Sequence, residues 1–175
     1  METGLLVTLL YGVFPKKDVI TRAVRLQNEG QELLTLESVQ SASLDLIYGD
    51  YDWIQFYGRH AMERNVQRIP AAHGAHVIGS RRGTSSHQYN PFVILAEKET
   101  TEDFGACYGM SFVYSGGFQA FAERDQYDQT RMGMGISPEG FSWSLKPGES
   151  FTAPEVILSY TGKGLGELSR QYHRI

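Results

Sequence analysis

The chain has 175 residues, of which 41% are apolar and 21% charged, and its formal net charge is −4. This length and composition are typical of one folded domain with its own core. The charge argues against a nucleic-acid-binding protein, because phosphate recognition needs a concentrated basic surface and the longest basic run here is the pair Arg81 and Arg82.

Several absences in the sequence point to a cytoplasmic protein. Cys107 is the single cysteine, so no internal disulfide can form, and no Asn-X-Ser/Thr glycosylation site is present. No apolar run reaches the ~20 residues that a membrane-spanning helix needs. The first residues, METGLLVTLLYGVF, lack the basic segment and the small-residue cleavage site of a signal peptide.

Most of the chain reads as short β-strands separated by turn residues. The 19 glycines and the 9 Phe and 10 Tyr residues favour turns and pleated surfaces. Strand-like runs are expected at residues 4–14, 18–28, 32–48, 75–82, 92–98, 108–116, 118–125, 130–136, 141–145 and 151–161. This regular spacing predicts an all-β sandwich or barrel.

The last residues predict a helix instead. Leu165, Leu168 and Tyr172 recur at helical spacing, with Arg and His near the end, where they suit the helix dipole. We therefore divide the chain into a β-domain over residues 1–162 and a helix over residues 163–175. Because it starts inside a strand pattern and stops on a helix, we expect a piece of a longer protein.

No metal or cofactor site is expected. His73 and His76 are three residues apart, which in a strand sends the two rings to opposite faces. No cysteine cluster or acidic set accompanies them. The glycine-rich MGMGISPEG segment is not followed by a helix with a phosphate-binding lysine. A metal hydrolase built on His73, His76 and His87 therefore has little support.

Catalytic groups are equally sparse. Asp50 and Asp52 lie on one side of an extended segment, as an acid–base pair requires, but Gly-Asp-Tyr-Asp is also a common loop composition. Cys107 is interpreted as a small buried hydrophobe. Ser85 and Ser86 directly precede His87, and neighbouring residues do not form a catalytic triad.

Aromatic residues next to polar ones leave two interpretations open. Trp53, Phe56, Tyr57, Tyr89 and Phe92 are flanked by Asp, Asn, Gln, Arg and His. Sugars stack on aromatic rings and bond such polar groups. The same pattern is also typical of a β-sandwich core with polar turns, and composition alone favours that second interpretation.

Five linked motifs carry a family resemblance. They are DYDWIQFYGRHAMERNVQR, SRRGTSSHQYNPF, YGMSFVYSGGF, MGISPEGFSWSLKPGESFTAPEV and GLGELSRQYHRI, in this order. Together they resemble the N-terminal domain of the bacterial α-galactosidases of glycoside hydrolase family 36, which act on melibiose and raffinose. The resemblance runs from about Leu5 to the end of the chain.

The resemblance implies a fold and an activity for the parent protein. The family's N-terminal domain is an antiparallel, galactose-mutarotase-like β-supersandwich, which a linker helix joins to a (β/α)₈ catalytic barrel. The family hydrolyses terminal α-galactose with retention, using two Asp residues on barrel strands. Neither lies in this chain, so it is expected to be inactive alone and to shape the pocket mouth and the subunit contacts. The family commonly forms homotetramers.

The resemblance also suggests roles for individual residues. Trp53 and His60 are candidates for the edge of the substrate pocket, with His60 where family members often carry Trp. A histidine offers a smaller stacking face, which puts stacking there in doubt. We expect a second set to satisfy backbone groups of a polar connection or to contact the barrel or another subunit: Arg81, Arg82, His87, Gln88 and Asn90. A free-standing carbohydrate-binding or structural β-sandwich is the alternative.

Overall fold

The computed structural model describes residues 3–175. The strands are β1 (Leu5–Phe14), β2 (Val19–Asn28), β3 (Leu34–Leu36), β4 (Gln40–Leu46), β5 (Tyr51–Arg59), β6 (Met62–Pro70), β7 (Gly74–Gly79), β8 (Tyr89–Glu97), β9 (Cys107–Phe112), β10 (Phe118–Arg124), β11 (Thr130–Ile136), β12 (Trp143–Leu145), β13 (Ser150–Thr152) and β14 (Val156–Thr161). A 3₁₀ turn, η1 (Pro15–Lys17), joins β1 to β2, and one α-helix, α1 (Gly164–His173), follows β14. The predicted all-β fold with a C-terminal helix is confirmed.

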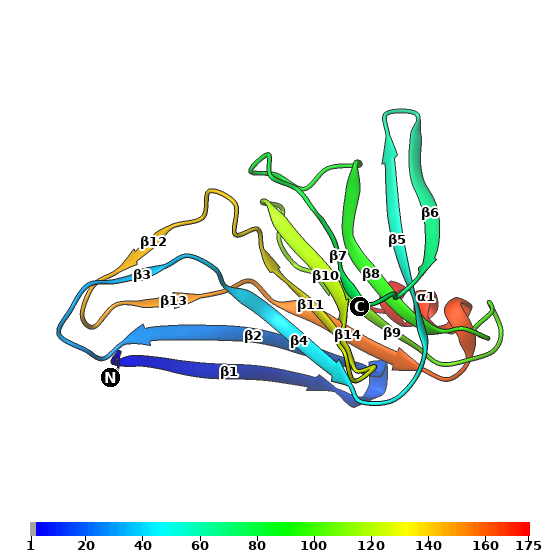
Figure 1. The fold of residues 1–175 in the computed structure, drawn as a ribbon, viewed down its shortest axis with the longest axis horizontal. Helices are drawn as coiled ribbons and strands as arrows, with labels where there is room; N and C mark the ends of the chain where they lie inside the picture. Colours follow the sequence, from blue (N-terminus) through cyan, green and yellow to red (C-terminus); the bar gives the residue numbers. More distant parts are fainter. Residues whose placement is uncertain (1–2) are drawn as a thin grey trace.

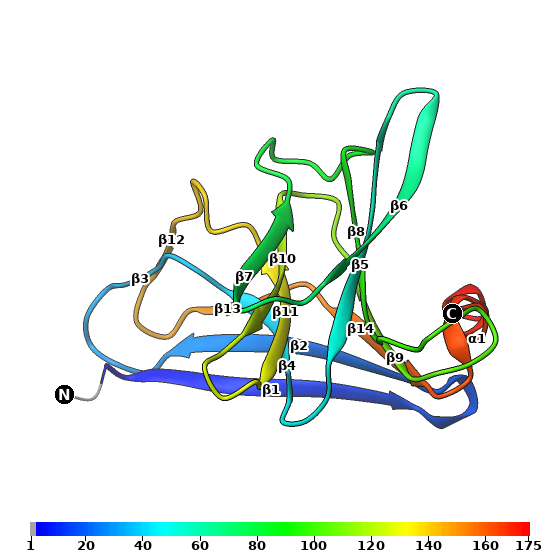
Figure 2. The same cartoon turned by 45° about the vertical axis from the view of Figure 1, so that its right-hand side comes forward.

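The strands form one large antiparallel sheet and two small ones. The large sheet has eight strands in the order β1-β2-β14-β9-β8-β5-β6, with β13 also paired to β2. A three-stranded sheet, β10-β11-β4, packs against one face of it, and β12 pairs with β3 beside the far end of β2. The long β1–β2 hairpin forms the base of the molecule, and the β5–β6 hairpin projects away from it (Figures 1 and 2).

The main core lies between the large sheet and the three-stranded sheet. The large sheet contributes Trp53, Leu95 and Met110, and the small one contributes Phe118 and Met132. All five side chains are fully buried. Successive strand residues point to opposite faces, so both partners alternate inward-facing apolar residues with outward-facing ones.

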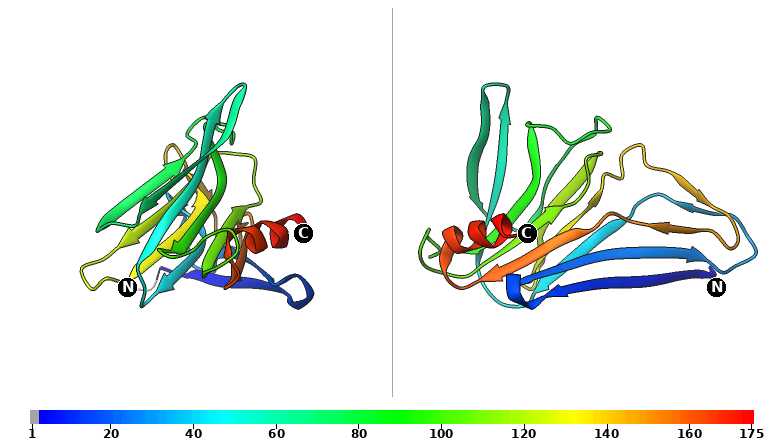
Figure 3. Two further views of the ribbon diagram at one scale, coloured as in Figure 1. Left: turned by 90° about the vertical axis from the view of Figure 1, so that its right-hand side faces the viewer. Right: turned by 180° about the vertical axis from the view of Figure 1, so that it is seen from behind.

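Helix α1 covers the opposite face of the large sheet (Figure 3). Leu168 packs there with Ile54, Ile94 and Cys107, which form a second buried cluster. The Tyr172 hydroxyl donates a hydrogen bond to the Ile157 carbonyl at 3.0 Å. Because helix and small sheet cover the two faces, the middle of the large sheet is buried on both sides, as the run of buried residues in β5 and β8 shows.

Some predicted strand limits were wrong. Residues 32–48 form two strands, β3 and β4, and residues 151–161 form the end of β13 and all of β14. Pro154 lies in the second break, where it has no N–H to donate to a ladder. No strand was predicted for residues 51–70, which form the β5–β6 hairpin.

Candidate functional site

The candidate site is the end of the molecule where four turns meet. They are the tip of the β5–β6 hairpin at residues 59–62 and the loops at residues 80–88, 113–117 and 137–142, here called the loop end. Backbone bonds tie three of these loops together: Ser85 N–H donates to Ser115 O at 2.8 Å, and Ser137 N–H to Gly117 O at 3.1 Å. The Gly58 N–H donates to Gln88 O at 3.3 Å and ties in the hairpin.

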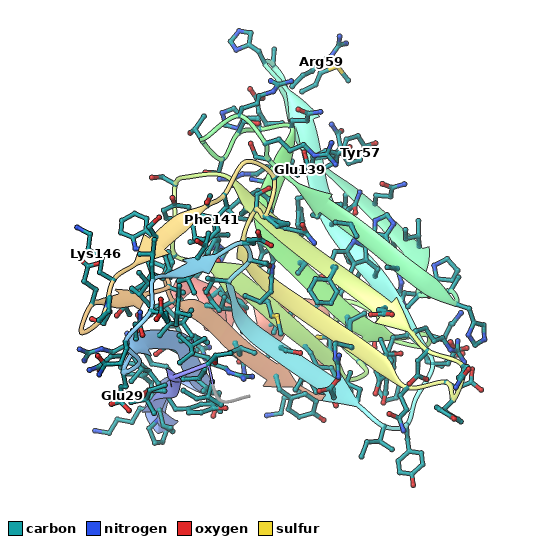
Figure 4. The ribbon with its side chains drawn as sticks, turned by 60° about the vertical axis from the view of Figure 1, so that its left-hand side comes forward. Glu29, Tyr57, Arg59, Glu139, Phe141 and Lys146 are labelled. Atoms are coloured by element: carbon teal, nitrogen blue, oxygen red, sulfur yellow. The ribbon has the colours of Figure 1, made fainter. Side chains whose placement is uncertain are left out.

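His60 lies at the hairpin tip and is exposed. Figure 4 shows Arg59, the residue before it, at the far end of the projecting hairpin. Ala61 adopts a left-handed backbone with φ of 62°, and its N–H donates to Glu63 Oε1 at 2.9 Å. The tip is therefore a defined turn that holds the imidazole away from the body of the domain. An exposed position is compatible with the expected role of His60 at a pocket edge.

Trp53 lies in the core, with 0% of its surface exposed. Its indole N–H donates to Gln55 Oε1 at 2.8 Å, so even its polar atom has a partner inside the domain. A side chain with no exposed surface does not contact a sugar. Of the two residues expected at the pocket edge, only His60 therefore remains a candidate. For Trp53 the β-sandwich core interpretation holds.

Gln55 is a buried polar hub that bonds three other side chains, and its role was not predicted from the sequence. It lies on the inner face of β5 with Trp53, and its Oε1 also bonds His76 Nε2 at 2.8 Å. Its Nε2 donates to Gln67 Oε1 at 2.8 Å. Because Oε1 is an acceptor, the His76 proton lies on Nε2. Burial lowers the pKa of His76, which favours this neutral ring.

The loop at residues 80–88 stabilises itself mainly through small hydroxyl residues. Ser80 Oγ donates to Thr84 O, and Ser86 Oγ accepts the Gln88 N–H at 3.2 Å. Five longer polar side chains were expected to bond backbone groups here: Arg81, Arg82, His87, Gln88 and Asn90. Within residues 3–175 none of them bonds a backbone group. That expectation was wrong, because short serines next to the backbone satisfy these groups instead.

Two of these predicted residues have other surroundings. Arg81 forms an ion pair with Glu139, with Nη2 and Oε1 2.7 Å apart. Asn90 Oδ1 is buried and has no hydrogen-bond partner within the described residues. The side chains of Arg82, His87 and Gln88 are exposed. The loop therefore presents several uncommitted polar groups at the loop end.

Asp50 and Asp52 are held by cations and are not poised as an acid and a base. Arg68 Nε lies 2.7 Å from Asp52 Oδ2, and Arg124 Nη1 lies 3.0 Å from Asp50 Oδ1. Lys98 Nζ lies between them, 3.5 Å from Asp50 and 3.7 Å from Asp52. The pair belongs to a structural ion-pair network at the opposite end of β5 from the hairpin tip.

The other chemical candidates also have structural surroundings. Cys107 is fully buried, and burial raises the pKa of its thiol to about 11, which suits an inert core residue. His73 and His76 do not converge: His73 is exposed and bonds the Asp125 carbonyl. Across residues 3–175 no three His, Cys, Asp or Glu side chains are grouped to hold a metal. No helix in this part is long and apolar enough to cross a membrane.

Fold and site together define an antiparallel β-domain with a docked terminal helix, and comparison with known proteins identifies its family. The sequence profile described as "Glycosyl hydrolase family 36 N-terminal domain" matches residues 1–146. The chain belongs to this domain family.

Individual relatives are similar in sequence to nearly the whole of this chain. The bifunctional α-galactosidase/sucrose kinase AgaSK of Mediterraneibacter gnavus is 59% identical over 95% of this chain, and AgaA of Geobacillus stearothermophilus, an α-galactosidase, is 47% identical over 98%. The solved galactosidase domain of AgaSK superposes with a TM-score of 0.95 at 57% identity, covering 97% of this chain and 24% of that one. An AgaA variant solved with raffinose superposes with a TM-score of 0.96 at 47% identity, with coverage of 98% and 24%.

The chain is much shorter than these relatives. It spans 18% of the length of AgaSK and 24% of AgaA. It therefore corresponds to one domain of them.

Proposed function

We propose that this chain is the non-catalytic N-terminal domain of an α-galactosidase that hydrolyses terminal α-galactose from raffinose-type oligosaccharides with retention. The observation that carries the proposal is the similarity of nearly the whole chain to proteins named α-galactosidases, at 47–59% identity. Complexes of AgaA variants with raffinose and stachyose support the substrate class. The test is a comparison of galactose release by this chain and by the full-length parent.

The chemistry is assigned to the parent's barrel domain, which supplies the two catalytic Asp residues that the family resemblance implies. The surroundings of the acidic residues in this chain support that division. Asp50 and Asp52 are neutralised by Lys98, Arg68 and Arg124. A retaining glycosidase needs one free carboxylate nucleophile and one protonated acid about 5–5.5 Å apart. This pair, bonded to three cations, does not offer that combination.

His60 is proposed to lie at the edge of the substrate pocket in the parent. Its exposed position on a projecting, turn-stabilised hairpin supports this role. In the full-length enzyme, we expect His60→Ala to raise KM for raffinose about 2–10-fold through loss of one hydrogen bond, with kcat little changed. The matched control is Val66→Ala, an exposed position lower on the same hairpin. An unchanged KM for His60→Ala would remove His60 from the pocket.

The same parent is proposed to be a cytoplasmic homo-oligomer, tetrameric as the resemblance implies. Apolar surface on the β1–β2 hairpin supports contacts with further protein. Leu6, Leu10 and Phe14 are exposed on one face of β1, and Val7 and Val13 on the other. We assign this surface to the rest of the parent, and His87 and Asn90 at the loop end to a contact with the barrel or another subunit. Light scattering on the full-length protein tests the oligomeric state.

A further inference from the structure

A polar cavity of about 450 Å³ opens at the loop end. One wall is the end of β7, from Val77 to Gly79, and the opposite wall is the loop that contains Ser137 and Glu139. Tyr89 and Gln119, from the first residues of β8 and β10, complete the lining. Figure 4 shows Glu139 at this end of the molecule, on the same side as Tyr57 of the projecting hairpin. The cavity lies within the size range of small-molecule sites in proteins.

Three polar side chains that line this cavity have no partner in the domain. The Arg82 guanidinium and the amides of Gln88 and Gln119 form no hydrogen bond or ion pair within residues 3–175. Gln119 is half-buried, so its amide is shielded from part of the solvent. The amide of Gln119 keeps contact with solvent, so a ligand with hydroxyl groups can replace water as its hydrogen-bonding partner.

One wall of the cavity is fixed by backbone contacts. The Ser80 N–H donates to Phe118 O at 2.9 Å, which joins the end of β7 to the start of β10. At Gly79 a Cβ atom would collide with the same carbonyl oxygen, so only glycine allows this close approach. On the opposite side, the Arg81–Glu139 ion pair links the loop at residues 80–88 to the loop at residues 137–142. A wall that is fixed before binding reduces the conformational entropy lost when a ligand binds.

We propose that this cavity binds a short saccharide through Arg82, Gln88 and Gln119. Planar amide and guanidinium groups each present two polar atoms side by side, which matches the neighbouring hydroxyls of a sugar ring. Arg81 and Glu139 neutralise each other, so the cavity retains one uncompensated charge, that of Arg82. Tyr89 supplies an aromatic ring next to these polar groups.

The choice of an α-galactoside as the saccharide rests on the proposed function, whereas the cavity itself does not. Raffinose is therefore the first probe, and maltotriose tests a sugar of similar size without galactose. Inorganic phosphate tests the alternative that Arg82 selects an anion.

Titration calorimetry of the 175-residue chain tests the proposal. We expect raffinose to bind at about 10 mM sugar or below. Arg82→Ala and Gln119→Leu should each weaken binding about tenfold, because each removes hydrogen bonds to the sugar. Arg131→Ala is the matched control, since Arg131 is an exposed arginine paired with Asp45 on β4 and does not line the cavity. Its affinity should equal that of the unmodified chain.

Three results would overturn the proposal: no heat with either raffinose or maltotriose at that concentration, binding of phosphate in place of sugar, or equal affinity of Arg82→Ala and the control. Circular dichroism checks the fold of each variant, and if Gln119→Leu unfolds, the exposed Arg82→Ala decides alone. Binding of maltotriose but not raffinose would keep a saccharide site and reject the galactoside. Galactose release by the full-length parent is measured separately, so a failure of the site and a failure of the proposed function are distinguishable.

Discussion

At the scale of single residues, the partly buried His76 makes the stability of the fold depend on pH. Its ring packs edge-on against Trp53 with centroids 5.7 Å apart, and its Nε2 bonds Gln55. Burial holds the pKa of His76 below its ordinary value of about 6.5 in the folded state. As the pH falls through that ordinary value, the unfolded chain binds the proton first, so the free energy of unfolding decreases.

This decrease in the free energy of unfolding at lower pH can be measured. Urea unfolding should show that the chain loses more stability between about pH 7 and pH 5.5 than the variant His76→Asn does, because the variant lacks the imidazole. His87→Asn is the control, because this exposed side chain forms no hydrogen bond within residues 3–175, and the variant should lose as much stability as the unmodified chain. Equal losses for the unmodified chain and His76→Asn would show that the imidazole does not contribute.

Residue roles were predicted unevenly. The burial of Cys107 was predicted correctly, because a lone cysteine among aromatic strand residues is usually a small hydrophobe. The hub at Gln55 was missed, although a polar residue two positions after Trp53 lies on the same strand face. Its partners His76 and Gln67 come from other strands, so local sequence alone does not reveal them.

At the scale of elements, helix α1 is joined to the sheet by a small number of contacts. Leu168 is 1% exposed, and Gln171 Oε1 accepts the Ser159 hydroxyl at 2.8 Å. We expect Leu168→Ala to lower the free energy of unfolding by about 2–5 kcal/mol, as large-to-small core substitutions do. Leu165→Ala, on the same helix but only half-buried, should cost less. Chemical denaturation measures both, and equal small losses would mean that α1 is not part of the cooperative fold.

The two edges of the large sheet differ in their protection. Edge strand β6 carries Glu63, Arg64 and Arg68 and ends at Pro70, all features that discourage strand pairing. Edge strand β1 has no charged residue in its ten positions and exposes large apolar side chains on both faces. This contrast supports the proposal that β1 contacts other protein in the parent.

The isolated chain should therefore associate through β1. We expect Leu10→Lys to raise the concentration at which the chain associates roughly tenfold, because a charged edge residue opposes strand pairing. Val66→Lys, at an exposed position on the charged edge strand β6, should change little. Sedimentation velocity over a concentration series distinguishes the two variants, and a chain that stays monomeric throughout would contradict the expected role of β1.

Element boundaries show where sequence patterns stop being informative. The helix was predicted correctly because Leu165, Leu168 and Tyr172 follow its period and pack on one cluster. The β5–β6 hairpin was not predicted, since the apolar run from Trp53 is buried on both faces and lacks alternation. Its second strand is polar and mostly exposed, and its pairing partner decides its conformation.

At the scale of the whole molecule, the chain is a scaffold with chemistry assigned elsewhere. Buried apolar clusters lie on both faces of the large sheet. The loop end carries the exposed His60 and the polar cavity. The cavity could not be predicted from the sequence, because its lining comes from segments as far apart as Val77 and Glu139. The family could be predicted, because it depends on linked motifs that extend along most of the chain.

The most direct test measures galactose release from raffinose by the purified 175-residue chain and by the full-length protein encoded by its gene. The account predicts no release by the chain alone and steady release by the full-length protein. Hydrolysis by the chain alone, abolished by Asp52→Asn, would place the chemistry in this domain. An inactive, correctly folded full-length protein would contradict its assignment to an α-galactosidase.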